Sequence, residues 1–314
     1  MGRRRKTGRS VNGVFLLNKP SGLTSNQALQ RVKRIFNANK AGHTGALDPL
    51  ATGVLPLCLG EATKFSQFLL DADKYYRSTY RLGISTATGD SEGEVIAERD
   101  ASSITRPQVE KALAAFKGQI EQIPSMYSAL KHHGQPLYRL ARKGIEVERP
   151  PRTVTVFDYQ ILDFRPGANP EVDVQVHCSK GTYIRTLAED LGRVLDSGAH
   201  VSALHRYKSG PFDERQTMSL CALEELREQQ TAEQLDRLLL PVDTAVEDRI
   251  ALDLDEITAG YFQLGQAITS NKVFRKAQEG DIVRVFRKGG TFLGIGTVTE
   301  DGKVAPKRLI VEDT

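Results

Sequence analysis

The 314-residue sequence contains little cysteine and no long apolar run. Its three cysteines, Cys58, Cys178 and Cys221, are odd in number and far apart, and none has the Cys-x-x-Cys spacing. This pattern predicts neither a disulfide framework nor a zinc site. No uninterrupted apolar stretch approaches the ~20 residues that span a bilayer, so we expect no membrane segment.

The sequence is slightly basic, and its charge is unevenly placed. The formal net charge is +4 and the pI is about 8.9, while 39% hydrophobic and 26% charged residues are ordinary for a soluble protein. Residues 1–10 form a basic arm whose cations are Arg3, Arg4, Arg5, Lys6 and Arg9. Such an arm suits phosphate contacts, with a solvated tail as the alternative. Because no apolar stretch of signal-peptide character follows it, the expected location is the cytoplasm.

Residues 42–53 are the most distinctive stretch of the chain. It reads GHTGALDPLATG, and its three glycines and one proline predict a loop held in turns. The apolar residues 54–59 follow directly and predict a buried strand, in which Pro56 indicates an edge or a bulge. A polar loop at the end of a core strand is a suitable place for a reactive group, here Asp48. The alternative is that Asp48 only caps backbone N–H groups.

Two further segments place polar residues at the ends of predicted elements. Residues 154–164 and 171–178 predict a β-hairpin, because the second run alternates apolar and polar side chains. It leads into SKGTYIR at residues 179–185, where a helix begins, and helix N-termini favour anions. Residues 198–206 read GAHVSALHR. Strand–turn–helix units are common in α/β proteins, so the pattern alone does not identify a site.

The segment at about residues 124–152 is an irregular excursion that mixes aromatic, small and basic side chains. Its cations are Lys131, Arg139, Arg142, Lys143, Arg149 and Arg152. The adjacent histidines His132 and His133 lack a third ligand at helical or hairpin spacing, so we predict no metal site there. From composition alone this is a surface excursion.

The remaining patterns predict an alternation of helices and strands. In the strand expected at residues 75–82, Tyr76, Ser78 and Tyr80 share one face. A tyrosine in a strand is usually half-buried packing. Thr24 and Gln27 form a capping box that opens a helix. Further helices are expected at residues 61–70, 107–117 and 255–264, and late strands at 281–286, 291–299 and 309–312.

Residues 42–53 closely resemble the catalytic segment of the TruB family of tRNA pseudouridine synthases. Residues 180–185, KGTYIR, match the second signature of that family, and residues 198–206 resemble its third motif. The third motif usually reads Leu-Arg-Arg, and His205 here replaces its first arginine while Leu204 and Arg206 are kept. The resemblance implies isomerisation of uridine 55 in the TΨC loop of tRNA to pseudouridine, by base flipping, without a cofactor or a metal.

The resemblance also implies roles for individual residues. The catalytic residues would be Asp48 as nucleophile, Tyr76 and Arg185. The substrate contacts would be His43, Tyr76, Tyr183, Leu204 and Lys19. Tyr76 would stack on the base and is the candidate for removing the C5 proton, His43 would contact the flipped nucleotides, and Lys19 would support the Asp48 loop. Whether Asp48 attacks C1′ or C6 stays open at this point.

The expected fold is α+β, with a central mixed or antiparallel sheet flanked by helices and loops and a small β-rich PUA-like domain at the C-terminus. Residues 11–248 would form the catalytic domain and residues 249–314 the PUA-like RNA-binding domain. The excursion at 124–152 resembles the insertion with which the family grips its RNA stem-loop. We expect a monomer whose partner is the T stem-loop of tRNA.

The environment of Asp48 can also be anticipated. An aspartate in a closed pocket is desolvated, which raises its pKa. We therefore expect Arg185 to form a charge-assisted hydrogen bond with Asp48 and to hold the folded pKa below the unfolded value.

Two other enzyme activities and one non-catalytic function are alternatives to the synthase. A glycoside hydrolase needs two facing carboxylates, and an aspartyl-phosphate enzyme needs Mg²⁺ ligands near the aspartate. A non-catalytic RNA-binding or tRNA-folding module would need only the basic segments.

Overall fold

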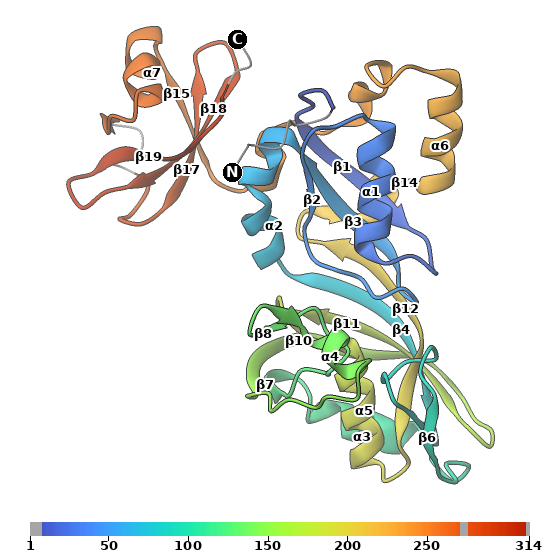
Figure 1. The fold of residues 1–314 in the computed structure, drawn as a ribbon. Coiled ribbons are helices and arrows are strands. Elements are labelled where there is room, and N and C mark those ends of the chain that lie inside the picture. Colours follow the sequence, from blue (N-terminus) through green and yellow to red (C-terminus); the bar gives the residue numbers. More distant parts are fainter. Residues whose placement is uncertain (1–7, 271–275, 312–314) are drawn as a thin grey trace.

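The computed structural model describes residues 8–270 and 276–311 (Figure 1). The cations at residues 3–6 of the basic arm lie outside the described residues. Arg9, the last cation of the arm, pairs with Asp236 and with the backbone carbonyl of Ala232. The protein itself therefore neutralises Arg9, and phosphate binding by the rest of the arm stays a prediction.

A ten-stranded mixed sheet forms the centre of the molecule, which confirms the predicted α+β fold. The main path of the sheet runs β14-β1-β3-β12-β4-β11-β10-β7. The strands along that path are β14 (Met218–Ser219), β1 (Gly13–Lys19), β3 (Thr52–Leu59), β12 (Ala199–Ser209), β4 (Lys74–Leu82), β11 (Glu171–Cys178), β10 (Arg152–Arg165) and β7 (Gly118–Gln122). Two short strands lie off the path, β2 (Ala41–His43) beside β3 and β13 (Phe212–Asp213) beside β12. The β1–β14 and β3–β12 pairs are parallel, and the others are antiparallel.

Helices cover the two halves of this sheet separately (Figure 1). Near β1, β2 and β3 lie α1 (Ser25–Ile35) and α6 (Leu220–Gln229), which also contact each other. Near β10 and β12 lie α3 (Arg106–Ala114) and α5 (Ile184–Val194), which again contact each other. The predicted capping box of Thr24 and Gln27 is present at the start of α1. The helix expected at residues 61–70 is divided into a 3₁₀ turn, Gly60–Lys64, and α2 (Ser66–Asp71).

The sequence patterns of the middle strands agree with the structure. In β4, Tyr76, Ser78 and Tyr80 are buried on one face. The predicted hairpin is β10 with β11, and the hydroxyl of Tyr159 in β10 donates to that of Tyr80 at 2.8 Å. These buried hydroxyls satisfy each other, which lets both tyrosines lie in the core.

Pro56 is not at a bulge, because β3 pairs with β1 in unbroken register, but it lies at a local edge, because neither β2 nor β12 pairs with it on the other side of β3. The Pro56 carbonyl accepts hydrogen bonds from the backbone N–H and the hydroxyl of Thr44 in the 42–53 loop. Within a strand, the N–H and C=O of one residue point to the same side. The missing N–H of Pro56 therefore faces the loop, where β2 has ended, and costs no ladder hydrogen bond.

The excursion at residues 124–152 contains little regular structure. Its elements are β8 (Lys131–His132), β9 (Gln135–Pro136) and α4 (Leu137–Ala141). Most of its side chains are exposed or half-buried. A separate two-stranded sheet, β5 (Ile84–Thr86) with β6 (Val95–Glu98), precedes it in the chain.

The C-terminal residues form a second sheet with the order β15-β17-β18-β19-β16. Its elements are β15 (Ile250–Leu254), α7 (Glu256–Gln263), β16 (Ile268–Thr269), β17 (Ile282–Arg287), β18 (Thr291–Val298) and β19 (Lys303–Leu309). The last strand was expected at 309–312 and instead ends where that range begins, while β15 and β16 had not been predicted. Phe292 of β18 packs on Phe65 of the main body at 5.5 Å between ring centroids.

No described helix is long and apolar enough to cross a membrane.

Candidate active site

The Asp48 loop, residues 44–51, joins β2 to β3 and is fixed by residues from both sides. The Ser25 hydroxyl, in the first turn of α1, accepts from the backbone N–H of Leu47 at 2.7 Å and donates to its carbonyl. Below the loop, the Lys19 ammonium donates to the carbonyls of Leu23 at 2.6 Å and Pro49 at 3.3 Å. Burial lowers the pKa of Lys19 to about 8. Because Lys19 has no exposed surface, its place fits the expected support of the loop and not a direct substrate contact.

Arg206 of β12 supports the same loop from the other side. Its guanidinium donates from Nε to the Val54 carbonyl at 2.8 Å and from Nη2 to the Gly45 carbonyl at 3.1 Å, and the residue is fully buried. The backbones approach so closely here that a Cβ on Gly53 would lie 2.2 Å from the Arg206 carbonyl oxygen. With φ at +104°, Gly53 also has a conformation that favours glycine. Glycine is therefore favoured at position 53 because a side chain would collide with the Arg206 backbone.

The expected contact between Asp48 and Arg185 is present. Arg185 is the second residue of α5, and its Nε lies 2.9 Å from Oδ2 of Asp48 while its Nη2 donates to Oδ1 at 3.2 Å. The Arg185 side chain is only 5% exposed, whereas that of Asp48 is 36% exposed. The arginine is thus a buried support, and the carboxylate faces the accessible side.

The expected direction of the Asp48 pKa was wrong. Burial raises the pKa of the Asp48 carboxyl, and the nearby carboxylate of Asp90 adds to that effect. Arg185 and, more weakly, Lys19 lower the pKa but do not reverse the shift. The guanidinium of Arg185 does not outweigh the desolvation of Asp48, because a second, buried carboxylate, that of Asp90, shares the same arginine.

Asp90 was missed by the sequence analysis. It lies in the glycine-containing turn after β5, is 3% exposed, and has its Oδ2 at 3.7 Å from Nη1 of Arg185. Its other oxygen accepts from the Thr88 hydroxyl and from the backbone N–H of Glu92. Polar turns of this kind are frequent on protein surfaces. The sequence shows only a polar, glycine-containing stretch here, and nothing in it indicates that the carboxylate of Asp90 is buried.

A cavity of about 400 Å³ opens over Asp48. Its lining includes five residues that the sequence pointed to, Asp48, Tyr76, Tyr183, Arg185 and Leu204. The segment Ser128–Leu130 of the excursion also lines it, and so do Leu70 and Ile184. Residues that are far apart in the sequence thus form a cavity with aromatic and aliphatic walls and one carboxylate.

The two tyrosines of this cavity are neutral phenols at neutral pH. Burial raises the pKa of Tyr76, and the neighbouring Arg206 only partly opposes this. Burial likewise raises the pKa of Tyr183, whose hydroxyl lies beside that of Ser128. Both rings can stack on a planar ligand, and neither is predisposed to act as a phenolate.

His43 lies in β2, beside the loop but outside the lining of the cavity. Burial lowers the pKa of its imidazole, and Arg206 acts in the same direction. Its Nδ1 is buried and has no hydrogen-bond partner within residues 8–270 and 276–311. A buried ring nitrogen without a partner is energetically costly.

His205, which departs from the resembled motif, is paired inside the protein. Its Nδ1 lies 2.8 Å from the Thr52 hydroxyl and its Nε2 lies 2.7 Å from Glu214. Glu214 also forms an ion pair with Arg77. His205, which stands where the motif usually has arginine, therefore has partners within the protein for both ring nitrogens.

In the described part of the chain, no three His, Cys, Asp or Glu side chains are grouped so as to hold a metal ion.

Comparisons with family models match almost the whole chain. Residues 33–184 match the model described as the N-terminal domain of the TruB family of pseudouridylate synthases. Residues 185–247 match the C-terminal domain of tRNA pseudouridylate synthase B, and residues 251–310 match the C-terminal part of pseudouridine synthase II TruB.

Similar proteins and structures agree with these matches. A protein of Saccharophagus degradans named tRNA pseudouridine synthase B is 56% identical over 310 residues, which cover 99% of both chains. A Coxiella burnetii protein of the same name is 53% identical over 302 residues, covering 96% of both. Among solved structures, a chain of a Cbf5–Nop10–Gar1 complex matches with a TM-score of 0.69 and 27% identity, covering 96% of this chain and 84% of that one.

Proposed function

Because the chain belongs to the TruB family of pseudouridine synthases, which are isomerases, we propose that it converts uridine 55 in the TΨC loop of tRNA to pseudouridine with Asp48 as nucleophile. The observation that carries the proposal is the Arg185–Asp48 pair at the floor of the cavity that Tyr76, Tyr183 and Leu204 enclose. The similar proteins that carry the name tRNA pseudouridine synthase B support tRNA as the substrate.

The reaction needs a nucleophile and a proton acceptor, and it is balanced within the uridine itself. The C1′–N1 bond breaks, a C1′–C5 bond forms, the proton on C5 is lost, and N1 gains a proton. Asp48 supplies a carboxylate that can attack C1′ of the sugar or C6 of the base. Arg185 opposes the effect of burial on its pKa and fixes both carboxylate oxygens.

The target base must leave the RNA stack to reach Asp48. Enzymes that act on a base commonly flip it into a pocket lined by aromatic and apolar groups. The cavity of about 400 Å³ has such walls in Tyr76, Tyr183 and Leu204. His43, which is half-buried beside the loop, would contact the nucleotides displaced with the base.

Removal of the C5 proton is assigned to Tyr76 on position alone. Tyr76 lines the cavity that also contains Asp48, so its side chain borders the space in which the base would be rejoined. Its raised pKa means that the resting hydroxyl is protonated. The phenol must therefore first release its own proton to water, and Arg206 beside it would stabilise the transient phenolate, which becomes neutral again when it takes the C5 proton.

The remaining segments would hold the RNA. In the excursion at 124–152, Lys131, Arg139, Arg142 and Lys143 are exposed and would reach phosphates of the T stem-loop. We propose residues 249–314 as a PUA-like RNA-binding domain and residues 11–248 as the catalytic domain. The proposal includes a monomeric, cytoplasmic enzyme that needs no cofactor.

The test uses tRNA labelled with tritium at C5 of its uridines. A pseudouridine synthase releases tritium to water as C5 loses its hydrogen, whereas a hydrolase, an aspartyl-phosphate enzyme or an RNA-folding module does not. A tRNA transcript with cytidine in place of uridine 55 serves as the control. We expect release from the first RNA and none from the second. Equal release from both would move the reaction to another uridine, and release from neither would refute the proposal.

A further inference from the structure

The Arg185 guanidinium has acceptors from three separate parts of the chain. Besides Asp48, its Nη1 donates to the Thr88 carbonyl at 2.7 Å and lies 3.7 Å from Asp90. Its Nη2 donates at 3.2 Å to Asp48 and at 2.9 Å to the backbone carbonyl of Tyr127. Together these contacts fix the plane of the guanidinium, which a single bidentate partner would leave free to tilt.

The acceptors differ in how firmly the fold holds them. The turn with Thr88 and Asp90 is pinned to β12, since Ser91 N–H donates to the Val201 carbonyl and Val201 N–H donates to the Gly89 carbonyl. Tyr127 instead belongs to the excursion at 124–152, in which only Pro124, Ser128 and Leu137 are buried. Segments with few buried contacts open at the lowest cost in free energy. Tyr127 is therefore the acceptor that Arg185 loses most easily.

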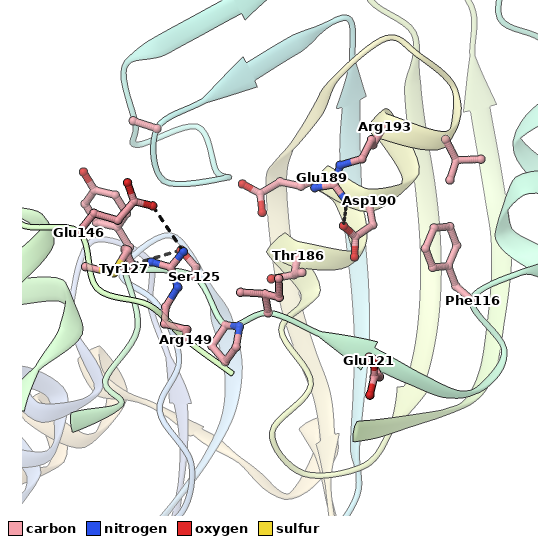
Figure 2. A pocket seen from close by; sticks show the side chains of 15 residues that line it. Phe116, Glu121, Ser125, Tyr127, Glu146, Arg149, Thr186, Glu189, Asp190 and Arg193 are labelled. Atoms are coloured by element: carbon pink, nitrogen blue, oxygen red, sulfur yellow. Dashed lines mark hydrogen bonds and ion pairs between the residues drawn. The ribbon is translucent and has the colours of Figure 1, made fainter. Parts of the chain in front are cut away.

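The structure leaves room for Tyr127 to move. Behind it, between the excursion and α5, lies a second cavity of about 600 Å³ (Figure 2). Figure 2 shows Ser125 and Tyr127 on one side of this cavity and Thr186, Glu189 and Asp190 of α5 on the other. The Ser125 hydroxyl accepts from the Tyr127 N–H at 3.1 Å and so fixes the backbone turn that leads up to the Tyr127 carbonyl.

From this arrangement we propose that the Tyr127 carbonyl couples the excursion to the nucleophile: when the excursion is seated, Tyr127 fixes Arg185 on Asp48, and when it is displaced, Arg185 loses that constraint. RNA that binds the cations of the excursion would thereby also set the rate of the chemical step. This inference rests on the proposed function. Tyr127 and Ser125 act as positioning residues, because neither side chain is needed to touch the reacting atoms.

The physical effect follows from the loss of one acceptor. Without the Tyr127 carbonyl, a buried N–H of Arg185 has no partner, and the guanidinium can tilt away from the two Asp48 oxygens. The carboxylate would then be less well aimed, and Arg185 would oppose the raised pKa of Asp48 less effectively. The rate constant should fall while RNA affinity stays the same.

The direct test weakens the carbonyl and keeps every side chain. Replacement of the backbone nitrogen of Ser128 by oxygen, through incorporation of the corresponding α-hydroxy acid, turns the Tyr127 carbonyl into an ester carbonyl, which is a weaker acceptor. The single-turnover rate at saturating enzyme should fall by about tenfold, the amount that corresponds to one charge-assisted hydrogen bond. The acid limb of the pH–rate profile should move to higher pH, and the Kd for tRNA should not change.

A second pair of variants controls for loss of the Ser128 N–H. Ser125→Ala removes the hydroxyl that fixes the turn before the Tyr127 carbonyl and should lower the rate in the same way, whereas Ser125→Thr keeps the hydroxyl and should retain the wild-type rate. An ester variant with wild-type rate and pH profile would overturn the inference, as would one that changes only the Kd. If the wild-type enzyme released no tritium, the proposed function itself would fail, so the two failures are distinguishable.

Discussion

The Arg185 guanidinium contacts both carboxylate oxygens of Asp48, a residue 137 positions earlier in the chain. Arg185 is buried, and Asp48 is partly open to the cavity, so one partner is structural support and the other is accessible. This relationship places a carboxylate at the bottom of an apolar cavity without leaving it unpaired.

Arg185 should be needed for both activity and stability. Arg185→Met leaves Asp90 and Asp48 without their cation and should lower the free energy of unfolding by about 3 kcal/mol, near the low end for a broken buried pair because Asp48 is partly exposed. Arg185→Lys keeps the charge but not the planar fork, so it should keep most stability and lose most activity. Denaturant unfolding and tritium release measure the two effects. A fully active Lys variant would contradict the account.

The pH dependence follows from the raised pKa of Asp48. A folded-state pKa above the unfolded value, about 3.9, means that the folded protein binds this proton more tightly than the unfolded chain. The stability from protonated Asp48 is present at low pH and is lost as pH rises through the folded pKa. Activity should rise over the same interval, because only the carboxylate attacks.

A single-turnover pH–rate profile tests this directly. Its acid limb should have a midpoint above about 3.9, and Arg185→Lys should move that midpoint further up, since the planar fork that opposes the raised pKa is gone. Asp48→Asn should remove this part of the pH dependence of stability. A midpoint at or below the ordinary aspartate value would show that Arg185 outweighs burial after all.

Substitution of Tyr76 should separate stacking from proton transfer. Tyr76→Phe keeps the ring in the cavity wall and removes only the hydroxyl near Arg206. If the hydroxyl accepts the C5 proton, this variant should bind tRNA and cleave the glycosidic bond but stall before product, while Tyr76→Leu should also bind the base poorly. Rapid-quench analysis of the RNA distinguishes these outcomes. Normal pseudouridine formation by the Phe variant would limit Tyr76 to packing.

The cations of the excursion should set the salt dependence of tRNA binding. The slope of log affinity against log salt falls by about 0.7–0.9 for each phosphate contact that is lost. Lys131→Ala and Lys143→Ala remove exposed cations for which we propose such contacts. As the matched control, Arg99→Ala removes a surface cation that pairs with Asp196 and should leave the slope unchanged. Equal slopes for all three variants would exclude phosphate contacts by Lys131 and Lys143.

The elements that were predicted correctly are those whose sequence pattern lies within one short segment. The alternation in residues 171–178 and the capping box at Thr24 each depend on neighbouring residues, and the structure confirms both. The extent of the helix expected at residues 61–70 and the place of the last strand were wrong, because tertiary packing decides where an element ends.

Features that depend on distant residues were not predictable in the same way. Arg206 supports Gly45 from 161 positions away, and nothing in either segment indicates this pairing. The direction of the Asp48 pKa depends on the balance of burial, Arg185 and Asp90, and Asp90 had not been placed in the site. Residue types could therefore suggest a nucleophile, but the electrostatics of the site required the geometry.

The measurement that tests the central claim most directly is single-turnover tritium release from 5-³H-uridine tRNA by wild-type enzyme and by Asp48→Asn, with tRNA affinity measured in parallel. The substitution keeps the shape of the side chain and its place beside Arg185, and it removes the negative charge. The account predicts an unchanged Kd and a rate below about one per cent of wild type, which corresponds to a barrier higher by roughly 3 kcal/mol or more. Release at a rate above that level by the Asn variant would contradict the assignment of Asp48 as nucleophile.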